Sequence, residues 1–317
     1  MSRSNRFAGR TALVTGSSRG LGLLLARELA DHGCRIMLCA RGADGLAAAE
    51  EKLRRRGADV AVQACDVTSP DTPQLLLDAV HDRFGRLDIL VNNAGIIQVG
   101  PMTTFEEEDF REAMEAMFFA PLRLAKAALP DLRAGAGTLV SISSIGGRIA
   151  APHLLPYAAA KFAHAGFSEG LRAEITQSGV SVTTVFPGLM RTGSHTAARF
   201  SGRPGAEYSW FAAAASLPLL SMDAERAARA IVRAAERRRP ELVLTPAAKA
   251  AVRLKGLAPA TTARLLSTAG RLLPTPGKQP LHNVTGTQAS HHSNLPGWIT
   301  ALGDKAGRRF GEPRTES

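Results

Sequence analysis

The chain has 317 residues, of which 45% are hydrophobic and 21% are charged, and its net charge is +11 at neutral pH. This balance is typical of a globular protein and excludes a collagen-like chain, a disulfide scaffold and a wholly disordered chain. The positive excess is concentrated in residues 246–317, which hold ten Lys or Arg and three Asp or Glu. Because residues 1–245 carry no comparable excess, we expect no nucleic-acid-binding core.

The N-terminus has no apolar stretch of signal-peptide length, and the longest run with few polar residues, 209–222, is too short to cross a bilayer. We therefore expect a soluble cytoplasmic protein. The chain has three cysteines, an odd number, and all lie in or beside apolar runs: Cys34, Cys39 and Cys65. This pattern predicts buried free thiols. No His, Cys and carboxylate residues have the spacing of metal ligands, so no metal site is expected.

Short apolar runs alternate with longer helical patterns along the first 245 residues. Strands are predicted over residues 11–15, 35–40, 60–64, 88–91, 138–143, 181–186 and 241–244. The helical patterns between them cover residues 21–31, 43–56, 70–84, 105–132, 156–177 and 223–238. This alternation predicts an α/β fold with a doubly wound, mostly parallel seven-stranded sheet of the Rossmann type and helices on both faces. A ligand should then bind at the carboxyl ends of the strands.

The pattern changes after residue 245. Residues 246–273 are rich in Ala, Leu and Lys or Arg and are interrupted by Gly256 and Pro259, which predicts two short amphipathic helices. Such basic helices can lie on an anionic membrane, but we favour packing of their apolar faces on the chain's own domain. Residues 274–317 are rich in Pro, Gly, Ser, Thr and His, which predicts a mostly disordered tail.

A glycine-rich turn follows the first predicted strand and opens the first helix. It reads Thr-Gly-Ser-Ser-Arg-Gly-Leu-Gly over residues 15–22. Gly16 allows a tight turn, Gly20 lets the backbone approach a phosphate, and Gly22 lets the helix pack closely on the strand. The free N–H groups of the helix N-terminus then favour a pyrophosphate. Many strand–helix turns contain glycine, so this signal alone is weak.

The TGxxxGxG spacing resembles the short-chain dehydrogenase/reductase family, and further motifs over residues 7–245 agree in type and order. The resemblance implies that a nicotinamide dinucleotide binds to Gly16, Ser18, Arg19, Gly20, Leu21, Gly22, Asp66, Val67, Asn93, Ala94, Gly95, Pro187, Gly188 and Thr192. These positions include the family's adenine-contacting Asp, its NNAG motif and its PGxxxT segment. Ser144, Tyr157 and Lys161 have the spacing of the family's catalytic Ser and YxxxK.

Charge indicates which dinucleotide is used. NAD-binding sites place a carboxylate at the end of the second strand to hold the ribose 2′-hydroxyl. Here that end reads Cys39-Ala40-Arg41 and has no carboxylate. Arg19 and Arg41 would instead suit the 2′-phosphate of NADP(H) through charge-assisted hydrogen bonds. The alternative is that both arginines are solvated surface residues.

The resemblance also implies a reaction. A phenol is a poor acid at neutral pH, and Lys161, one helical turn after Tyr157, should favour the phenolate and lower its pKa. Lys161 would also bind the nicotinamide ribose. Ser144 would polarise a substrate carbonyl, and Tyr157 would donate the proton as hydride arrives at carbon. A lone Tyr-x-x-x-Lys is usually incidental, so the interpretation depends on the other motifs.

Met117 stands where the family usually has a catalytic Asn. The family Asn uses its main-chain carbonyl to hold a water that relays protons, so Met117 preserves the relay only if its helix keeps a local distortion. The alternative is a misaligned helix. His153, Leu154 and Leu189, with Ser144 and Tyr157, are candidate substrate contacts, and the apolar segment 193–220 resembles the family's lid.

Two functions are compatible with these observations. The favoured one is an NADP(H)-dependent oxidoreductase that interconverts a carbonyl and a secondary alcohol on an apolar small molecule. The alternative is a catalytically weak NADPH-binding protein whose basic extension contacts a partner or a membrane. The family commonly pairs subunits through its fourth and fifth helices, so we also expect a homodimer or homotetramer through residues 110–129 and 157–171.

Overall fold

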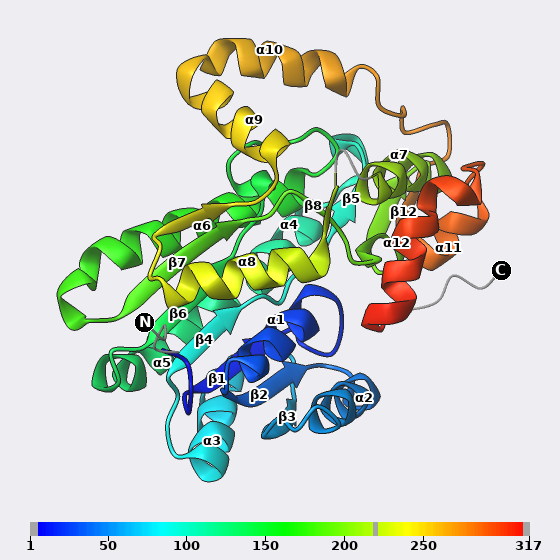
Figure 1. Ribbon diagram of the computed structural model, residues 1–317. Coiled ribbons are helices and arrows are strands. Elements are labelled where there is room, and N and C mark those ends of the chain that lie inside the picture. The colour runs from blue at the N-terminus through cyan, green and yellow to red at the C-terminus, as the bar shows by residue number, and fades with distance from the viewer. Residues whose placement is uncertain (1–5, 218–220, 313–317) are drawn as a thin grey trace.

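The computed structural model describes residues 6–217 and 221–312 (Figure 1). A central sheet contains seven strands in the spatial order β11-β7-β6-β4-β1-β2-β3, and every neighbouring pair is parallel. The strands are β1 (Thr11–Thr15), β2 (Arg35–Ala40), β3 (Val60–Ala64), β4 (Ile89–Asn92), β6 (Thr138–Ile142), β7 (Ser181–Phe186) and β11 (Glu241–Val243). This order confirms the predicted doubly wound Rossmann-type sheet.

Helices cover both faces of this sheet. One face carries α1 (Gly20–Asp31), α2 (Ala43–Arg54) and α8 (Ala224–Glu236). The other carries α3 (Thr72–Phe84), α5 (Ala120–Ala134) and α6 (Leu155–Glu174), while α4 (Glu107–Met114) precedes α5. Apart from the break between α4 and α5, each boundary lies within a few residues of the sequence prediction, because apolar positions repeat along these helices at the helical period.

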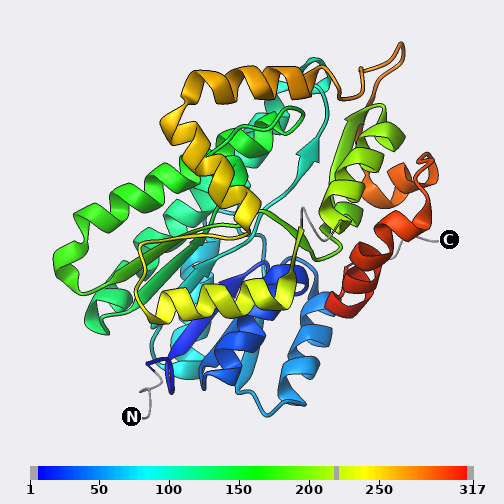
Figure 2. The same cartoon turned by 45° about the horizontal axis from the view of Figure 1, so that its top comes forward.

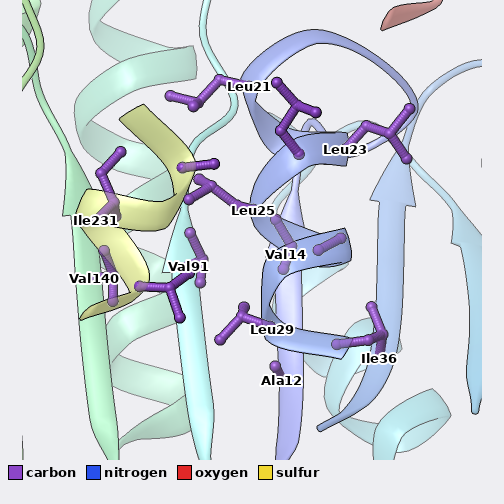
Figure 3. Close-up of a cluster of buried hydrophobic side chains, with 14 of the residues drawn as sticks. Ala12, Val14, Leu21, Leu23, Leu25, Leu29, Ile36, Val91, Val140 and Ile231 are labelled. Atoms are coloured by element: carbon purple, nitrogen blue, oxygen red, sulfur yellow. The ribbon is translucent and has the colours of Figure 1, made fainter. Parts of the chain in front are cut away.

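The core under α1 explains why the sheet needs so few aromatic residues. Leu25 and Leu29 of α1 point toward Val14 and Val91 of the strands and toward Ile231 of α8 (Figure 3). Each of these side chains is no more than 2% exposed. Burying one such aliphatic side chain stabilises the fold by about 1.5–3 kcal/mol. The packing fixes α1, and therefore the glycine-rich turn at its start, against the sheet.

Smaller elements lie beyond the carboxyl ends of the main strands. A three-stranded sheet combines β5 (Gln98–Val99), β9 (Arg199–Gly202) and β12 (Leu281–Thr285), and β8 (Leu189–Arg191) pairs with β10 (Ser221–Asp223). Helix α7 (Pro204–Ser216) lies in the segment expected to be the lid, part of which falls on residues outside the described ranges. These elements cover the edge of the sheet where a ligand is expected.

The C-terminal region is more ordered than the sequence predicted. The expected break gives α9 (Pro246–Leu257) and α10 (Pro259–Gly270), which lie together at one end of the molecule (Figure 2). Their predicted packing is met only in part, because Leu257 and Leu265 remain 87% and 55% exposed. No helix within the described ranges is long and apolar enough to span a bilayer.

The predicted disordered tail is wrong for the residues described. Beyond residue 280 the chain forms β12, α11 (Gly286–His291) and α12 (Gly297–Phe310). β12 pairs antiparallel with β9, and α12 packs on α7 and α1. The partners of these elements are about 80 or more residues away in sequence, so local composition could not predict their order.

Candidate active site

The glycine-rich turn has the close packing that its glycines imply. Gly16 and Gly20 have positive φ values of 63° and 56°, which side chains other than glycine rarely adopt. A Cβ on Gly22 would lie 2.2 Å from the carbonyl oxygen of Gly16 and 2.6 Å from Nδ2 of Asn93. Glycine at position 22 therefore allows α1 to start against the turn, with its N–H groups directed at the carboxyl end of the sheet.

The segment after β4 holds this turn in place. The Asn93 side chain donates to the carbonyl oxygens of Thr15 at 2.9 Å and Gly16 at 3.2 Å. The hydroxyl of Thr15 accepts from the backbone N–H groups of Asn93 and Ala94, each at 3.0 Å. The NNAG motif thus acts here as a support for the glycine-rich turn. The backbone at the end of β1 holds the Asn93 side chain, and the Asn92 side chain donates to the carbonyl oxygen of Pro121 in α5.

Charged residues lie at the ends of the next two strands. Arg41 follows β2 and Asp66 follows β3. Burial opposes the charged form of Asp66, but hydrogen bonds from Thr68 and the positive charge of Arg41 outweigh it, so the pKa of Asp66 is lowered. The structure therefore brings the expected adenosine-side residues Arg41 and Asp66 together.

Arg19 has a partner that the sequence did not predict. Its Nε lies 3.0 Å from a carboxylate oxygen of Glu312, and a Cβ on Gly20 would be 2.9 Å from the other oxygen. Glu312 falls in the segment predicted to be disordered. The carboxylate is thus placed at the N-terminus of α1, beside the turn that is expected to bind phosphate.

The remaining expected cofactor positions surround the same edge. Leu21 lies in the first turn of α1, and Val67 packs against the core on the far face of the sheet. Thr192 is buried, and its hydroxyl accepts from the N–H of Ser194 at 3.2 Å. The other positions expected to bind the dinucleotide, which lie in the turn after β1 or directly after β4 and β7, are Ser18, Gly95, Pro187 and Gly188.

The three residues with catalytic spacing meet beside this turn. Ser144 follows β6, while Tyr157 and Lys161 lie one turn apart at the start of α6, where Pro156 suits the first helical turn. The Ser144 hydroxyl lies close enough to the Tyr157 phenol to affect its pKa. Lys161 is buried, and its Nζ lies 5.9 Å from the Tyr157 ring centroid and donates to the carbonyl oxygen of Ile142 at 2.8 Å.

Burial controls the protonation of these groups. It raises the pKa of the Tyr157 phenol, and the neighbouring Ser144 side chain opposes this rise. Burial also lowers the pKa of Lys161 to about 8. The expected lowering of the phenol pKa by Lys161 is therefore absent from this structure, because the ammonium donates to the Ile142 carbonyl instead of to the phenol.

The long helix expected before the fifth main strand is interrupted. A π-helical turn, Glu115–Phe119, separates α4 from α5 and contains Met117. Met117 is fully buried, and a Cβ on Gly95 would lie 3.2 Å from its Sδ and 3.7 Å from Nζ of Lys161. Met117 therefore lies beside Lys161 on a distorted helix, which contradicts the misalignment alternative. Such π-helical turns are rare in proteins overall, and many of those known lie at functional sites.

One buried histidine close to these residues was missed by the sequence analysis. His164, one turn beyond Lys161, is 2% exposed, and neither ring nitrogen has a hydrogen-bond partner among the described residues. Burial and the charge of Lys161 lower its pKa to about 3. It is therefore a neutral imidazole, and a lone helical His carries no sequence signal that would have identified it.

A cavity of about 390 Å³ opens beside the start of α6. Its walls are mostly apolar and come from the loop after β5, the loop before α6 and the helix α10. They are formed by Pro101, Met102, Ala150, Ala151, Pro152, His153, Leu155, Leu266, Ser267 and Gly270. Of the five residues predicted to contact the substrate, only His153 lines this cavity; Ser144 and Tyr157 do not. Leu154 packs with the residues around α7, and Leu189 lies in β8.

His153 connects this cavity to α7. Its Nδ1 lies 2.9 Å from a carboxylate oxygen of Glu207, which is fully buried and also accepts from Trp210 Nε1 at 2.7 Å. His153 has a positive φ of 62°, so the loop before α6 turns sharply there. The buried Glu207, which the sequence did not single out, thus anchors α7 to the wall of the cavity.

Comparison with known proteins agrees with this geometry. Residues 10–200 match the family model described as short chain dehydrogenase. The chain is 36% identical over 184 residues to a putative ketoacyl reductase of Streptomyces coelicolor, covering 57% of this chain and 70% of that protein. It is 33% identical over 187 residues to the 3-oxoacyl-[acyl-carrier-protein] reductase FabG of Escherichia coli, covering 59% and 75%.

Solved structures give the same result. An actinorhodin polyketide ketoreductase variant with NADPH has a TM-score of 0.66 and 28% identity, over 75% of this chain and 95% of that one. L-Sorbose reductase of Gluconobacter frateurii, complexed with NADPH and L-sorbose, has a TM-score of 0.66 and 26% identity over the same shares. The chain therefore belongs to the short-chain dehydrogenase family, whose members are oxidoreductases that use a nicotinamide cofactor.

Proposed function

We propose that this protein is an NADP(H)-dependent oxidoreductase that interconverts a carbonyl and a secondary alcohol on an apolar small molecule, with Tyr157 as the general acid and base. The observation that carries the proposal is the grouping of Ser144, which follows β6, with Tyr157 and the buried Lys161 one turn apart on α6. The group lies at the carboxyl ends of the strands, beside a glycine-rich turn, where Rossmann-type sheets bind ligands.

The chain's own groups suit carbonyl reduction. The Ser144 hydroxyl can donate a hydrogen bond to the substrate oxygen and hold it near the phenol of Tyr157. Tyr157 can then donate its proton to that oxygen, and its raised pKa keeps it protonated at neutral pH. Once its Nζ leaves the Ile142 carbonyl, Lys161 can stabilise the phenolate that Tyr157 becomes. The bound cofactor supplies the hydride.

The residues around the glycine-rich turn fit a dinucleotide phosphate. The unpaired N–H groups at the start of α1 favour an anion, and Gly20 leaves room for its approach. Arg41 lies at the end of β2, where a carboxylate would otherwise select NAD(H). The NADPH in the two ketone-reducing structural relatives supports the same choice.

Charge reversal at Arg41 tests this cofactor choice. NADPH should bind more tightly than NADH, and Arg41→Asp should reverse much of that preference, because a carboxylate repels the 2′-phosphate and accepts from a 2′-hydroxyl. Titration calorimetry at low salt measures both affinities. The control is Arg133→Asp, which makes the same change of charge at an exposed residue near the C-terminus of α5, before β6 begins. Equal affinities of the native protein for the two cofactors would contradict the assignment.

The cavity whose lining includes Leu155, two residues before Tyr157, supports the proposed substrate class. Its apolar walls favour an apolar carbonyl compound. The names of two relatives, a putative ketoacyl reductase and a 3-oxoacyl-[acyl-carrier-protein] reductase, likewise refer to ketones of acyl chains. A screen of ketones and aldehydes with purified protein and NADPH tests the overall proposal. Turnover of at least one carbonyl is expected.

A catalytically weak NADPH-binding protein is the second candidate. Met117 in place of the family Asn favours it, and so do the exposed leucines of the basic extension. NADPH binding without turnover of any carbonyl or alcohol would support this candidate over the enzyme.

We also propose that the protein is at least a homodimer through α5 and α6. Phe119, directly before α5, and Phe162, within α6, are 41% and 37% exposed, which suits a surface that a second copy covers. A monomer in sedimentation at micromolar concentration would contradict this assignment.

A further inference from the structure

Two thiols face each other at the edge of the sheet where the adenosine half of the cofactor is proposed to bind. Cys39 is near the end of β2, and Cys65 directly follows β3. Their Sγ atoms are 3.3 Å apart. Cys39 is fully buried and Cys65 is partly exposed, so only Cys65 is open to a reagent in solution. The third thiol, Cys34, lies apart from this pair and donates to the carbonyl oxygen of Phe7.

The backbone ties this thiol pair to the proposed cofactor site. The N–H of Cys39 donates to the Ser17 hydroxyl at 2.9 Å, and the N–H of Ser17 donates back to the Cys39 carbonyl at 3.1 Å. The N–H of Cys65 donates to the carbonyl of Ala40 at 3.0 Å. A movement of either cysteine is therefore transmitted to the glycine-rich turn or to the residues beside Arg41.

We propose that Cys39 and Cys65 form a redox-sensitive dithiol, and that its oxidation by hydrogen peroxide to a disulfide weakens dinucleotide binding. The effect on binding rests on the proposed function. A disulfide needs an S–S distance of about 2.05 Å, so the sulfur atoms must approach by more than an ångström. That approach shifts the ends of β2 and β3, which carry Arg41 and Asp66.

The reaction balances with peroxide as the oxidant. The Cys65 thiolate attacks one peroxide oxygen and the O–O bond breaks. Cys65 becomes a sulfenic acid, and the released hydroxide takes up the proton lost by Cys65 to form the first water. The Cys39 sulfur then attacks the Cys65 sulfur, and the displaced hydroxyl departs with the Cys39 proton as the second water. Two thiols are oxidised to one disulfide, and one peroxide is reduced to two waters. The hydrogen bond from Cys39 lowers the pKa of Cys65, which favours Cys65 as the attacking thiolate.

Mass spectrometry of the peroxide-treated full chain tests the pair. A Cys39–Cys65 cross-linked peptide should form while Cys34 stays reduced. The NADPH dissociation constant should rise at least threefold and return after dithiothreitol. Cys39→Ser and Cys65→Ser should be insensitive, and Cys34→Ala, the matched control, should respond like the native protein.

Each contrary result has a distinct meaning. Absence of the cross-linked peptide would overturn the proposal that Cys39 and Cys65 form a redox-sensitive dithiol. A disulfide that leaves NADPH affinity unchanged would overturn its effect on binding. If the reduced protein binds no nicotinamide dinucleotide, the proposed function fails and the binding effect fails with it, while the cross-link still decides whether the dithiol exists.

An independent observation concerns the surface formed by the glycine-rich turn and the residues after Thr192. The Glu312 side chain is 6% exposed and lies between them. It contacts Arg19 and the position of Gly20 on one side, as described above. On the other side, a Cβ on Gly193 would be 3.4 Å from its Cγ. A buried carboxylate therefore separates the two segments that are expected to bind the dinucleotide.

The helix before Glu312 is fitted to this surface through two small residues. Gly303 and Gly307 lie one turn apart on α12 and are both buried. A Cβ on Gly303 would be 2.5 Å from Ser216 Oγ, and one on Gly193 would be 2.3 Å from the Cα of Gly307. A Cβ on Gly307 itself would be 3.3 Å from the Cα of Gly193 and 3.6 Å from the Cβ of Glu312, so a side chain as large as leucine at Gly307 cannot be accommodated without movement.

We infer that the C-terminal end of α12, residues 307–312, and a nicotinamide dinucleotide compete for this surface. This inference also rests on the proposed function. The N-terminus of α1 attracts an anion, and the Glu312 carboxylate occupies the place of a phosphate. Burial raises the pKa of Glu312, although Arg19 opposes this, so the buried charge is costly and a phosphate can displace it.

Leucine substitution tests the competition without a change of charge. Gly307→Leu should release α12 and tighten NADPH binding; if nine tenths of the native molecules are closed, the gain is about tenfold. Gly256→Leu is the matched control and should bind like the native protein, because a Cβ there would meet no atom within 4 Å among the described residues outside its own helix. In the native protein, saturating NADPH should accelerate hydrogen exchange of the amides in residues 303–311.

A Gly307→Leu protein that binds NADPH no more tightly than the native protein would overturn the competition. Slower exchange of residues 303–311 with NADPH would also overturn it, because α12 would then be part of the cofactor site. Glu312→Ala provides a second variant, should Gly307→Leu fail to fold, and should also bind more tightly. If no variant binds NADPH, the cofactor assignment itself fails and this competition fails with it.

Discussion

Replacing Tyr157 with Phe should reduce carbonyl reduction by about two to four orders of magnitude, the usual contribution of general acid catalysis. The change removes the proposed proton donor but keeps the ring, so folding and NADPH binding should survive. Lys161→Met should also lose activity and, in addition, weaken cofactor binding. NADPH oxidation with a carbonyl found by screening, together with the cofactor affinity of each variant, provides the measurement.

The chain offers a matched control for this experiment. Tyr208 in α7, its only other tyrosine, is 4% exposed and packs with Phe200 of β9. Tyr208→Phe should keep most of the activity, because this phenol is not paired with Ser144. Met117→Asn should leave the rate similar or raise it. If Tyr157→Phe turns over like the native protein, the mechanism is wrong.

Gly22→Ala should produce the second large effect, on both stability and cofactor binding. Its Cβ would lie 2.2 Å from the Gly16 carbonyl oxygen and 2.6 Å from Asn93 Nδ2, so α1 or the glycine-rich turn must move. Overpacking of this kind costs about 1–3 kcal/mol of unfolding free energy. Thermal unfolding with and without NADPH should show a lower midpoint and a smaller stabilisation by the cofactor.

If helix propensity alone decided the outcome, a Gly→Ala change in a helix would raise the unfolding midpoint instead of lowering it. Alanine stabilises a helix interior relative to glycine by about 1 kcal/mol when nothing obstructs its side chain. Gly170→Ala, in α6 with no atom within 4 Å, should therefore raise the midpoint. If Gly22→Ala is as stable as Gly170→Ala and binds NADPH normally, the close packing of the turn does not control the site.

Much of the fold could be predicted from local patterns. The seven main strands and their parallel arrangement follow from apolar runs that alternate with amphipathic helices, since two-sided burial requires both. The site follows for a related reason. Gly16, Gly22 and the NNAG motif meet in space because the turn after β1 and the segment after β4 end at the same edge of adjacent strands. The spacing of Tyr157 and Lys161 places both on one face of α6.

Several features were decided by tertiary contacts alone. The order of β12 and α12 depends on pairing with β9 and packing on α7, which no local composition reveals. The protonation of Tyr157 and Lys161 depends on burial and on the Ile142 carbonyl, and the sequence gives no measure of either. Glu312 reaches Arg19 across almost the whole chain. The sequence by itself determined the elements and the edge where chemistry is placed, because both depend on near neighbours. Only the tertiary structure decided which distant side chains occupy that edge, because burial and pairing depend on the complete packing.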